Sequence, residues 1–488
     1  MRQLTSLDAQ FLALENARQT GHVAGLAIYD TSTTATGGLT CADMKQLISD
    51  RLHLLPPLRW RLVEVPLGAD YPYWVDDTDF DLDFHVRELA LAPPGDERQL
   101  AEQVARLHAR SLDRARPLWE LYVISGLRDG HVAVYTKIHH AVIDGVSGAE
   151  ITGMLLDLSP EIRQVEAEDL PDAAGRRPGQ AELLARALLG LPRYPLRVLR
   201  SLPSALPNLE ETQFSAIPGA GRLGRTLGQV QRLVSGDPNR AIRSELKAPK
   251  TSFNGRISPH RRFAFGQLDL DRVKALKTAY GVTVNDVVVT ICAGAVRRWL
   301  LDHDELPEEP LVTQVPVSVR STEQAGTYGN RILMLGAPLF TNIADPAERL
   351  RRTHDELKVM KDRHRAMPAD LLQDVNHFIP PALFSRAARA TFRLATSSAG
   401  RPQWNLVISN VPGPQFPLYC AGARLVAHYP VSVITDGMGL NITAMSYDGH
   451  IDVGIIADRD QVADVWCLVD YLNDSIAELE KAASTLEL

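Results

Sequence analysis

The sequence predicts an α/β protein of two domains, each built on a mixed β-sheet covered by helices. With 488 residues the chain is too long for one ordinary hydrophobic core, so two domains of about 200 residues each are expected. Apolar residues make up 45% of the chain, which is enough for globular cores. In the first third, segments with helical periodicity alternate with short β-branched segments, an order typical of a mixed sheet with helices packed on it.

The first domain is predicted from periodicity and from local start signals. The first helix is expected to be capped by Ser6 or Asp8. The third helix carries its leucines and a valine on a single stripe, as a helix packed on a core does. The expected elements are helices over residues 6–12, 41–54 and 97–112, and strands over residues 22–29, 121–124 and 132–136.

The middle of the chain changes in composition. Residues 157–178 are rich in Pro, Asp, Glu and Gly, which predicts a linker. Beyond residue 182, four arginines follow at offsets of 7, 4 and 3, which places them on one helical face; they are Arg186, Arg193, Arg197 and Arg200. A solvated crossover that packs on the two domains is the favoured interpretation of this basic amphipathic segment, and contact with an anionic membrane or a lipid droplet is the alternative hypothesis.

The second domain is expected to begin with a strand and two helices. The pair Asn285-Asp286 suits a helix start, where free N–H groups and the helix dipole favour polar or negative side chains. Two alternating segments around the turn at residues 447–450 predict a hairpin. The expected elements are strands over 262–265, 404–411, 440–446 and 451–456, helices over 270–280, 284–300 and 462–488, and a helix-rich stretch over 346–396.

Composition excludes several classes of function. A net charge of −7 and a pI near 6.1 argue against nucleic acid as the main partner. The four cysteines lie far apart with no CxxC spacing, which fits buried thiols in a reducing compartment. The N-terminus shows no apolar h-region of a secretory signal. No uncharged apolar run approaches the ~20 residues that span a bilayer, so a cytoplasmic protein is expected.

Residues 139–145 read His-His-Ala-Val-Ile-Asp-Gly and directly follow the buried strand over 132–136. Neutral imidazole is the side chain best matched to removing a proton near neutral pH. In a strand, His139 and His140 would point to opposite faces, so at most one should face a given cavity and the other should be structural. Asp144 is close enough to brace the turn or orient an imidazole, and Gly145 permits a backbone conformation that other residues resist.

Other readings of the motifs compete with this interpretation. Paired histidines at a strand end also occur as a satisfied structural pair. A catalytic zinc needs three protein ligands, and alternation along a strand points these two rings apart, so no metal is predicted. A GxGxxG match at residues 219–224 follows no convincing strand, so a dinucleotide site is rejected.

The segment from His139 to Gly145 resembles the HHxxxDG motif of the coenzyme A-dependent acyltransferase superfamily. More narrowly, the chain is similar to the bacterial wax ester synthase/diacylglycerol acyltransferase family, especially its actinobacterial triacylglycerol synthases. The motif is supported by the order of further segments along the chain. These are Pro-Leu-Trp at residues 117–119, Asn285-Asp286, residues 315–320, residues 329–331 and the strand and turn at residues 404–414.

The resemblance implies a fold and an activity. It implies two chloramphenicol-acetyltransferase-like subdomains with a channel at their interface, over residues 1–175 and 256–488, joined by a basic helical crossover over 176–255. Acyl-coenzyme A would be a co-substrate, with no other cofactor, and diacylglycerol or a fatty alcohol would accept the acyl group. His140 would be the general base, with His139 and Asp144 in the catalytic motif.

The resemblance also implies supporting residues around the motif. They are Gly145, Asn285, Asp286 and Ser409. Helix capping remains the alternative role for Asn285 and Asp286. Two other functions stay open: an acyltransferase of the superfamily with a different alcohol or an amine as acceptor, and a non-catalytic relative that binds lipid. The protein would be cytoplasmic, with contact at the inner membrane face or lipid droplets.

Overall fold

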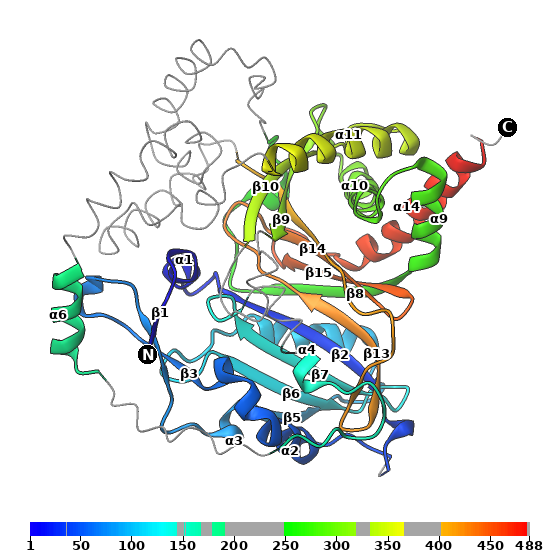
Figure 1. Cartoon of the computed structure of the whole chain (residues 1–488). Coiled ribbons are helices and arrows are strands. Elements are labelled where there is room, and N and C mark those ends of the chain that lie inside the picture. The colour runs from blue at the N-terminus through cyan, green and yellow to red at the C-terminus, as the bar shows by residue number, and fades with distance from the viewer. Residues whose placement is uncertain are drawn as a thin grey trace.

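Two six-stranded mixed sheets form the centre of the computed structural model (Figure 1). Helices cover both sheets, so the predicted α/β fold with two mixed, helix-covered sheets is confirmed. A separate three-stranded sheet lies beside the first one. The structure describes residues 1–35, 37–143, 151, 153–166, 178–190, 248–318, 332–365 and 402–485.

The first sheet has the strand order β12-β13-β2-β7-β6-β5. β5 and β6 are parallel, and the other neighbours are antiparallel. The strands of this sheet are β2 (His22–Asp30), β5 (Val86–Ala90), β6 (Trp119–Ser125), β7 (Val132–His139), β12 (Tyr419–Cys420) and β13 (Ala423–Val431). The helices beside it are α1 (Ser6–Leu14), α2 (Cys41–Arg51), α3 (Leu82–His85) and α4 (Glu97–His108), and the small sheet holds β1 (Arg2–Gln3), β3 (Trp60–Val63) and β4 (Tyr73–Asp76).

The second sheet has the order β10-β9-β11-β14-β15-β8, with β11 parallel to both of its neighbours. The predicted hairpin is confirmed: β14 and β15 pair antiparallel from end to end. The strands are β8 (Arg261–Asp269), β9 (Leu311–Ser318), β10 (Ile332–Leu339), β11 (Leu406–Val411), β14 (Leu440–Tyr447) and β15 (His450–Asp458). The helices are α9 (Leu270–Tyr280), α10 (Val284–Asp302), α11 (Pro346–Arg365) and α14 (Trp466–Ser484).

A strand from the last quarter of the chain completes the first sheet. β13 pairs antiparallel with β2, and Figure 1 shows it in orange beside the blue and cyan strands. Its side chains alternate between buried and more exposed positions along its length, as in a strand that contacts different environments on its two faces. The sequence-based prediction contained no strand here. The proposed division at residues 1–175, 176–255 and 256–488 stays a prediction, and β13 belongs by pairing to the first sheet.

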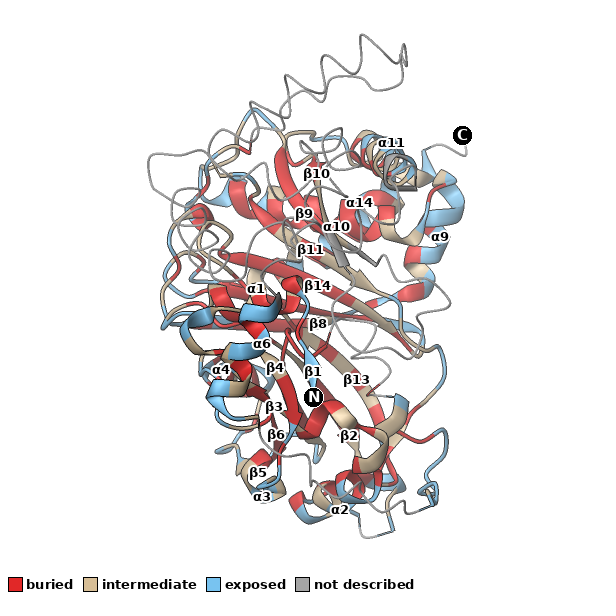
Figure 2. Ribbon diagram, turned by 60° about the vertical axis from the view of Figure 1, so that its left-hand side comes forward, coloured by how far each residue is buried: buried red, intermediate tan, exposed pale blue. Residues whose placement is uncertain are grey.

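The two sheets pack against each other through a shared apolar core (Figure 2). A Cβ on Gly454 of β15 would overlap the carbonyl oxygen of Pro430 in β13, so the backbones of the two sheets approach closely there. Asp452 of β15 is buried, and its carboxylate accepts hydrogen bonds from the His428 backbone N–H at 2.7 Å and from Gln267 at 2.9 Å. Burial raises the pKa of Asp452 to about 6, although both hydrogen bonds oppose the shift.

The apolar run that opens the second domain is a core helix. The stretch of α10 from Asp286 to Val296 is buried throughout. Within the described residues no single helix is long and apolar enough to cross a membrane. α9 and α10 reach the length and apolar composition of a membrane span only when they are taken together, across a bend of 105°. The burial of α10 is explained by the core of the second domain, in which its apolar residues pack.

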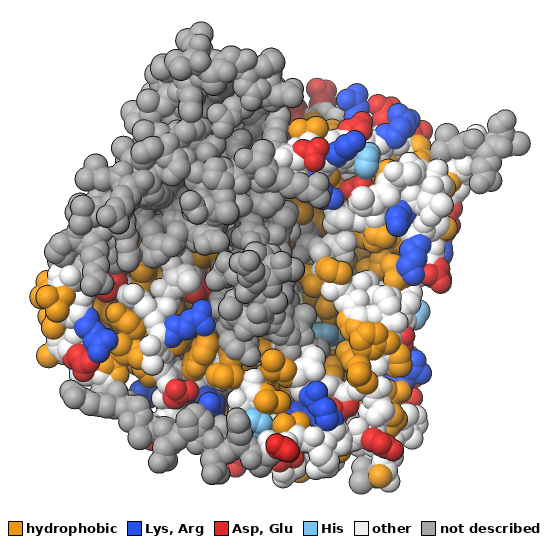
Figure 3. All heavy atoms as spheres, viewed as in Figure 1, with side chains coloured by type: hydrophobic (Ala, Val, Ile, Leu, Met, Phe, Trp, Pro, Cys, Tyr) orange, Lys and Arg blue, Asp and Glu red, His pale blue; other side chains and the backbone are white. Residues whose placement is uncertain are grey.

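Part of the predicted crossover is described as a helix. α6 (Gln180–Gly190) packs Leu183 and Ala187 against Val65, and Arg186 lies on its exposed face. Arg193, Arg197 and Arg200 lie outside the described residues, as does most of the predicted linker. On the face seen in Figure 3, the described Lys and Arg side chains are interspersed with Asp and Glu.

Asp157, which the sequence places at the start of the linker, is instead buried in the first domain. Its carboxylate pairs with Arg51 of α2, at 2.9 and 2.8 Å from Nη2. Both side chains are almost fully buried. The Asp157 backbone also exchanges two hydrogen bonds of 2.8 Å with Tyr419, which begins β12. The chain that follows residues 139–145 is therefore fixed to α2 and to the edge of the first sheet.

Candidate active site

The histidine pair lies at the end of β7, where backbone hydrogen bonds hold it on both sides. The N–H of His139 donates to the carbonyl of Leu118 at 2.9 Å, and the N–H of His140 donates to the carbonyl of Gly21 at 2.8 Å. His139 is in register with His22 of β2. The backbone of this pair is therefore positioned by the neighbouring strands β6 and β2 as well as by its own strand.

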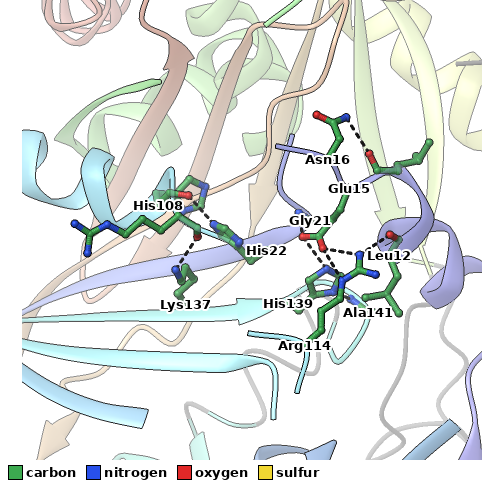
Figure 4. A network of polar contacts seen from close by, with 12 residues as sticks. Leu12, Glu15, Asn16, Gly21, His22, His108, Arg114, Lys137, His139 and Ala141 are labelled. Atoms are coloured by element: carbon green, nitrogen blue, oxygen red, sulfur yellow. Dashed lines mark hydrogen bonds and ion pairs between the residues drawn. The ribbon is translucent and has the colours of Figure 1, made fainter. Parts of the chain in front are cut away.

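His139 is buried, and contacts with its neighbours orient its ring. The backbone N–H of Ala141 donates to Nδ1 at 3.0 Å, so Nδ1 carries the lone pair and the proton of the neutral ring sits on Nε2. Nε2 lies 3.2 Å from Oε1 of Glu15, close enough for an electrostatic contact but not aligned as a good hydrogen bond. The ring keeps 1% of its surface exposed. His139 is thus held in one tautomer by Ala141 and Glu15 (Figure 4).

Glu15 follows α1 directly and connects several parts of the site. Its Oε1 accepts the N–H of Gly21 at 2.8 Å, and its Oε2 accepts Nη2 of Arg114 at 2.7 Å. Arg114 also donates to the carbonyl of Leu12 at 2.6 Å (Figure 4). Burial alone would raise the pKa of Glu15, but His139, Arg114 and Gly21 outweigh it and lower that pKa to about 2. Glu15 is therefore an anion at neutral pH.

Gly21 has no room for a side chain. A Cβ there would lie 2.8 Å from Nε2 of His139 and 3.2 Å from the carbonyl oxygen of Phe11. The same residue donates to Glu15 and accepts from His140 through its backbone. Glycine at this position lets α1 and β7 come close enough for both contacts.

His140 has different surroundings from His139. Its ring stacks on the ring of Phe11, with 4.2 Å between the centroids and 6° between the planes. It retains 9% of its surface exposed, compared with 1% for His139. Both histidines are buried, and His140 is the less completely buried of the two.

A second group of polar side chains lies on the same strand pair (Figure 4). Nε2 of His22 lies 2.7 Å from the carbonyl of His108, and Lys137 donates to the carbonyl of Leu107 at 3.2 Å. Burial lowers the pKa of His22 well below its usual value, lowers that of His108 to about 3, and lowers that of Lys137. These histidines are neutral at physiological pH. The group ties the end of α4 to β2 and β7.

The candidates from the second domain are placed at the start of α10 and on β11. Asp286 caps α10: it forms a capping box with Thr283, and its Oδ2 lies 2.7 Å from Nδ1 of His354. Oδ1 of Asn285 accepts Nδ2 of Asn410 at 3.4 Å, and Asn410 follows Ser409 in β11. Asn285 and Ser409 therefore belong to neighbouring elements of one sheet and its covering helix. Asp286 has the structural role that helix capping predicts.

Asp144 and Gly145 of the motif lie outside the described residues. Among the residues that the structure describes, no group of three or more His, Cys, Asp or Glu side chains is placed to hold a metal ion. Of the HHxxxDG motif, the structure describes residues 139–143.

Four residues around the histidine pair were not identified from the sequence. They are Phe11, Glu15, Gly21 and Arg114. The sequence singled out the helix over residues 6–12 only as a capped element, and it gave Glu15 no signal, since a carboxylate at a helix end is usually solvated. The contacts from this helix to β7 depend on the fold and cannot be read from local patterns.

Comparison with known proteins identifies the family. A family model described as the wax ester synthase/diacylglycerol acyltransferase catalytic domain matches residues 4–288. The chain belongs to this family. The model of the WS/DGAT C-terminal domain matches residues 328–480, so the two matches together span most of the chain. The resemblance inferred from the HHxxxDG motif is confirmed.

Similar proteins agree with this family assignment. A probable diacylglycerol O-acyltransferase of Mycobacterium tuberculosis is 35% identical over 480 residues, which are 97% of this chain and 98% of that protein. The solved wax ester synthase/diacylglycerol acyltransferase from Marinobacter aquaeolei VT8 is 30% identical, with a TM-score of 0.66 and coverage of 99% of this chain and 100% of that one.

A more distant structure shows the fold alone. The trichothecene 15-O-acetyltransferase TRI3 from Fusarium sporotrichioides is 13% identical, with a TM-score of 0.60 and coverage of 99% of this chain and 94% of that one. The predicted chloramphenicol-acetyltransferase-like architecture is confirmed by this similarity together with the two mixed sheets. The chain is thus an acyltransferase of the wax ester synthase/diacylglycerol acyltransferase family.

Proposed function

We propose that the protein transfers a long-chain acyl group from acyl-coenzyme A to a lipid alcohol. Diacylglycerol as acceptor gives triacylglycerol, and a fatty alcohol gives a wax ester. Family membership supports the reaction class, and the names of the relatives from Mycobacterium tuberculosis and Marinobacter aquaeolei support these acceptors. Acyl-coenzyme A is a co-substrate, and the proposal needs no other cofactor.

His140 is the general base in this proposal. It takes the proton of the acceptor hydroxyl as the oxygen attacks the thioester carbonyl, and then returns that proton to the departing thiolate of coenzyme A. Because transfer is direct, no acyl-enzyme forms, and the sequence holds no GxSxG nucleophile elbow for one. Base catalysis of this kind commonly contributes about 10²–10⁴-fold.

The contrast between the two rings is the observation that carries this choice of base. His139 is buried with Nδ1 occupied by the Ala141 N–H and Nε2 facing Glu15. His140 retains more exposure, so of the two rings it is the better placed to meet a substrate. His139 then positions the end of β7, and Asp144 holds the loop that follows.

The tetrahedral oxyanion needs donors that are fixed before the reaction. Backbone N–H groups near Gly145 and the side chains of Asn285 and Ser409 are the proposed donors. The Asn285 side chain contacts Asn410, which follows Ser409 in β11, so these two proposed donors lie on adjoining elements.

The substrates are proposed to enter a channel between the two domains from opposite sides. Acyl-coenzyme A would use one mouth and the lipid alcohol the other. We propose that the reaction takes place in the cytoplasm, at the inner membrane face or at lipid droplets. Both substrates carry long apolar chains and concentrate at such surfaces.

Incubation of the purified protein with palmitoyl-coenzyme A tests the function. Thiol release is followed after addition of dipalmitoylglycerol, hexadecanol or hexadecylamine. Release with either alcohol supports the proposal, release with the amine alone identifies a different acceptor class, and release with none identifies a non-catalytic lipid-binding relative.

The variant His140→Ala tests the base. We expect turnover to fall about 10²–10⁴-fold while the protein stays folded, because the proton acceptor is lost. The exposed His303 serves as the control, and His303→Ala should keep wild-type turnover. Full activity of His140→Ala would remove His140 from this role.

A further inference from the structure

Phe11 of α1 presents its aromatic face to the ring of His140. The two planes are 6° from parallel and the centroids are 4.2 Å apart. Among the described residues, Phe11 is the aromatic side chain stacked on this imidazole. The contact joins the helix that opens the chain to the residue proposed as the base.

Phe11 is itself fixed at both ends of its helix. At the start of α1, Thr5 and Asp8 form a reciprocal capping box. At the other end, Arg114 donates to the carbonyl of Leu12 while it also binds Glu15. A ring on a helix held in this way has little freedom to move away from His140.

This stack has two consequences for a general base. First, a ring held parallel to the imidazole hinders its rotation about the χ2 bond, so the plane of the imidazole is fixed. Second, an aromatic face attracts a cation, so it stabilises the imidazolium that forms when the base takes a proton. That attraction is stronger in the transition state than in the ground state, which is the condition for raising kcat.

Stacking alone does not mark a functional histidine. His85 lies between Phe80 and Trp119, with centroid distances of 5.2 and 4.4 Å, and is completely buried. Its Nδ1 lies 2.7 Å from the Trp119 carbonyl, and burial lowers its pKa. His140 differs because it follows the end of β7, lies inside the HHxxxDG motif, and is less completely buried than His85.

We propose that Phe11 is a positioning residue for His140, which fixes the plane of the imidazole and stabilises its protonated form. The inference rests on the proposed role of His140 as the base. Phe11 needs no contact with the substrate for this role, since it acts through the imidazole.

The test compares Phe11→Leu, which removes the ring and keeps an apolar side chain, with Phe11→Tyr, which keeps the aromatic face. With palmitoyl-coenzyme A and dipalmitoylglycerol or hexadecanol, Phe11→Leu should lower kcat about 2- to 30-fold with KM unchanged. Phe11→Tyr should retain most of the wild-type kcat. Phe80→Leu, which removes the matching stack from His85, should leave kcat at the wild-type value.

A double variant separates positioning from general packing. In the His140→Ala background, Phe11→Leu should cause no further loss, because the ring it positions is absent. Wild-type kcat in Phe11→Leu, together with an inactive His140→Ala, overturns this inference alone. An active His140→Ala overturns the proposed base instead.

Two further outcomes also count against the role of Phe11. A kcat of Phe11→Tyr as low as that of Phe11→Leu shows that the aromatic face is not what matters. A loss that appears only in KM assigns Phe11 to substrate binding. If Phe11→Leu does not fold, Phe11→Met replaces it, and wild-type kcat in that variant overturns the inference.

Discussion

Replacing Glu15 by glutamine removes one charge from the centre of the histidine network and changes little else in shape. One carboxylate oxygen of Glu15 contacts Gly21 and His139, and the other contacts Arg114. All three partners are donors. An amide therefore turns its NH₂ group toward at least one donor, whichever way it is oriented.

The size of the effect follows from the environment of the carboxylate. The pKa of Glu15 falls from 4.5 to about 2, and at about 1.4 kcal/mol per unit the ionised form is favoured by roughly 3 kcal/mol. Hydrogen bonds from His139, Arg114 and Gly21 are among the causes of that shift, and burial opposes it. Because the amide of glutamine can still accept from part of this set, about 1–2 kcal/mol of unfolding free energy should be lost.

The effect on turnover should be larger than the effect on folding. Without the carboxylate, His139 loses the group that faces Nε2, and the end of β7 that carries His140 is less well fixed. A shift of about 1 Å at a reacting group costs up to about 10²-fold, so kcat of Glu15→Gln should fall by about 10- to 100-fold. Thiol release from palmitoyl-coenzyme A measures kcat, and urea denaturation measures the unfolding free energy.

Glu64 provides a matched control, because it contacts the same arginine from a more exposed position. Its Oε1 lies 3.5 Å from Nη1 of Arg114, and 68% of its side chain is exposed. Glu64→Gln should change stability by less than about 0.5 kcal/mol and leave kcat unchanged. The reasoning fails if Glu15→Gln matches wild type in both assays, or if Glu64→Gln loses as much. The lowered pKa of Glu15 stabilises the folded protein fully above the unfolded pKa of 4.5 and progressively less below it. The stability difference between wild type and Glu15→Gln should therefore shrink as pH falls from 4.5 toward 2.

Two further substitutions test the packing around His139 and the buried contact between the two large sheets. Gly21→Ala should lower the unfolding free energy by about 1–3 kcal/mol and reduce thiol release, because its Cβ would stand 2.8 Å from His139; Gly38→Ala, with nothing within 4 Å of its Cβ, should match wild type in both assays. Asp452 has a raised pKa of about 6 against an ordinary 3.8, so wild type should lose about 3 kcal/mol of stability as pH rises through that window. Asp452→Asn should lack this loss in denaturation at about pH 4 and pH 7, and an unchanged pH dependence would contradict the assignment.

Much of the fold could be predicted because its signals are local. The β14–β15 hairpin follows from alternation around a turn, and α10 follows from a cap and a continuous apolar run. The place of β13 could not be predicted. Its alternation was present in the sequence, but nothing local indicates that a strand from the last quarter pairs with β2 in the first. The ion pair of Arg51 with Asp157 was missed for the same reason, since a charged residue in a polar stretch predicts a solvated linker.

The residues of the candidate site likewise divide into those with a local signal in the sequence and those whose contacts depend on the fold. The histidine pair was predicted because residue type, strand end and spacing coincide within seven positions. Asp286 was a candidate whose capping alternative matches the contacts observed, with Thr283 and His354 as partners. Phe11 and Glu15 gave no signal, because an aromatic and a carboxylate on a short helix are ordinary until the helix is placed against β7.

The segment between α1 and β2 links the histidine pair to the second domain. Glu15 and Gly21 face His139 from this segment, and the carbonyl of Arg18 between them accepts a hydrogen bond from Arg261. The neighbouring Gln19 side chain accepts the backbone N–H of Asp436 at 3.3 Å. A displacement of the second domain relative to the first would therefore act on the same short segment that fixes His139. The geometry of the proposed base therefore depends on these contacts with Arg261 and Asp436 as well as on β7.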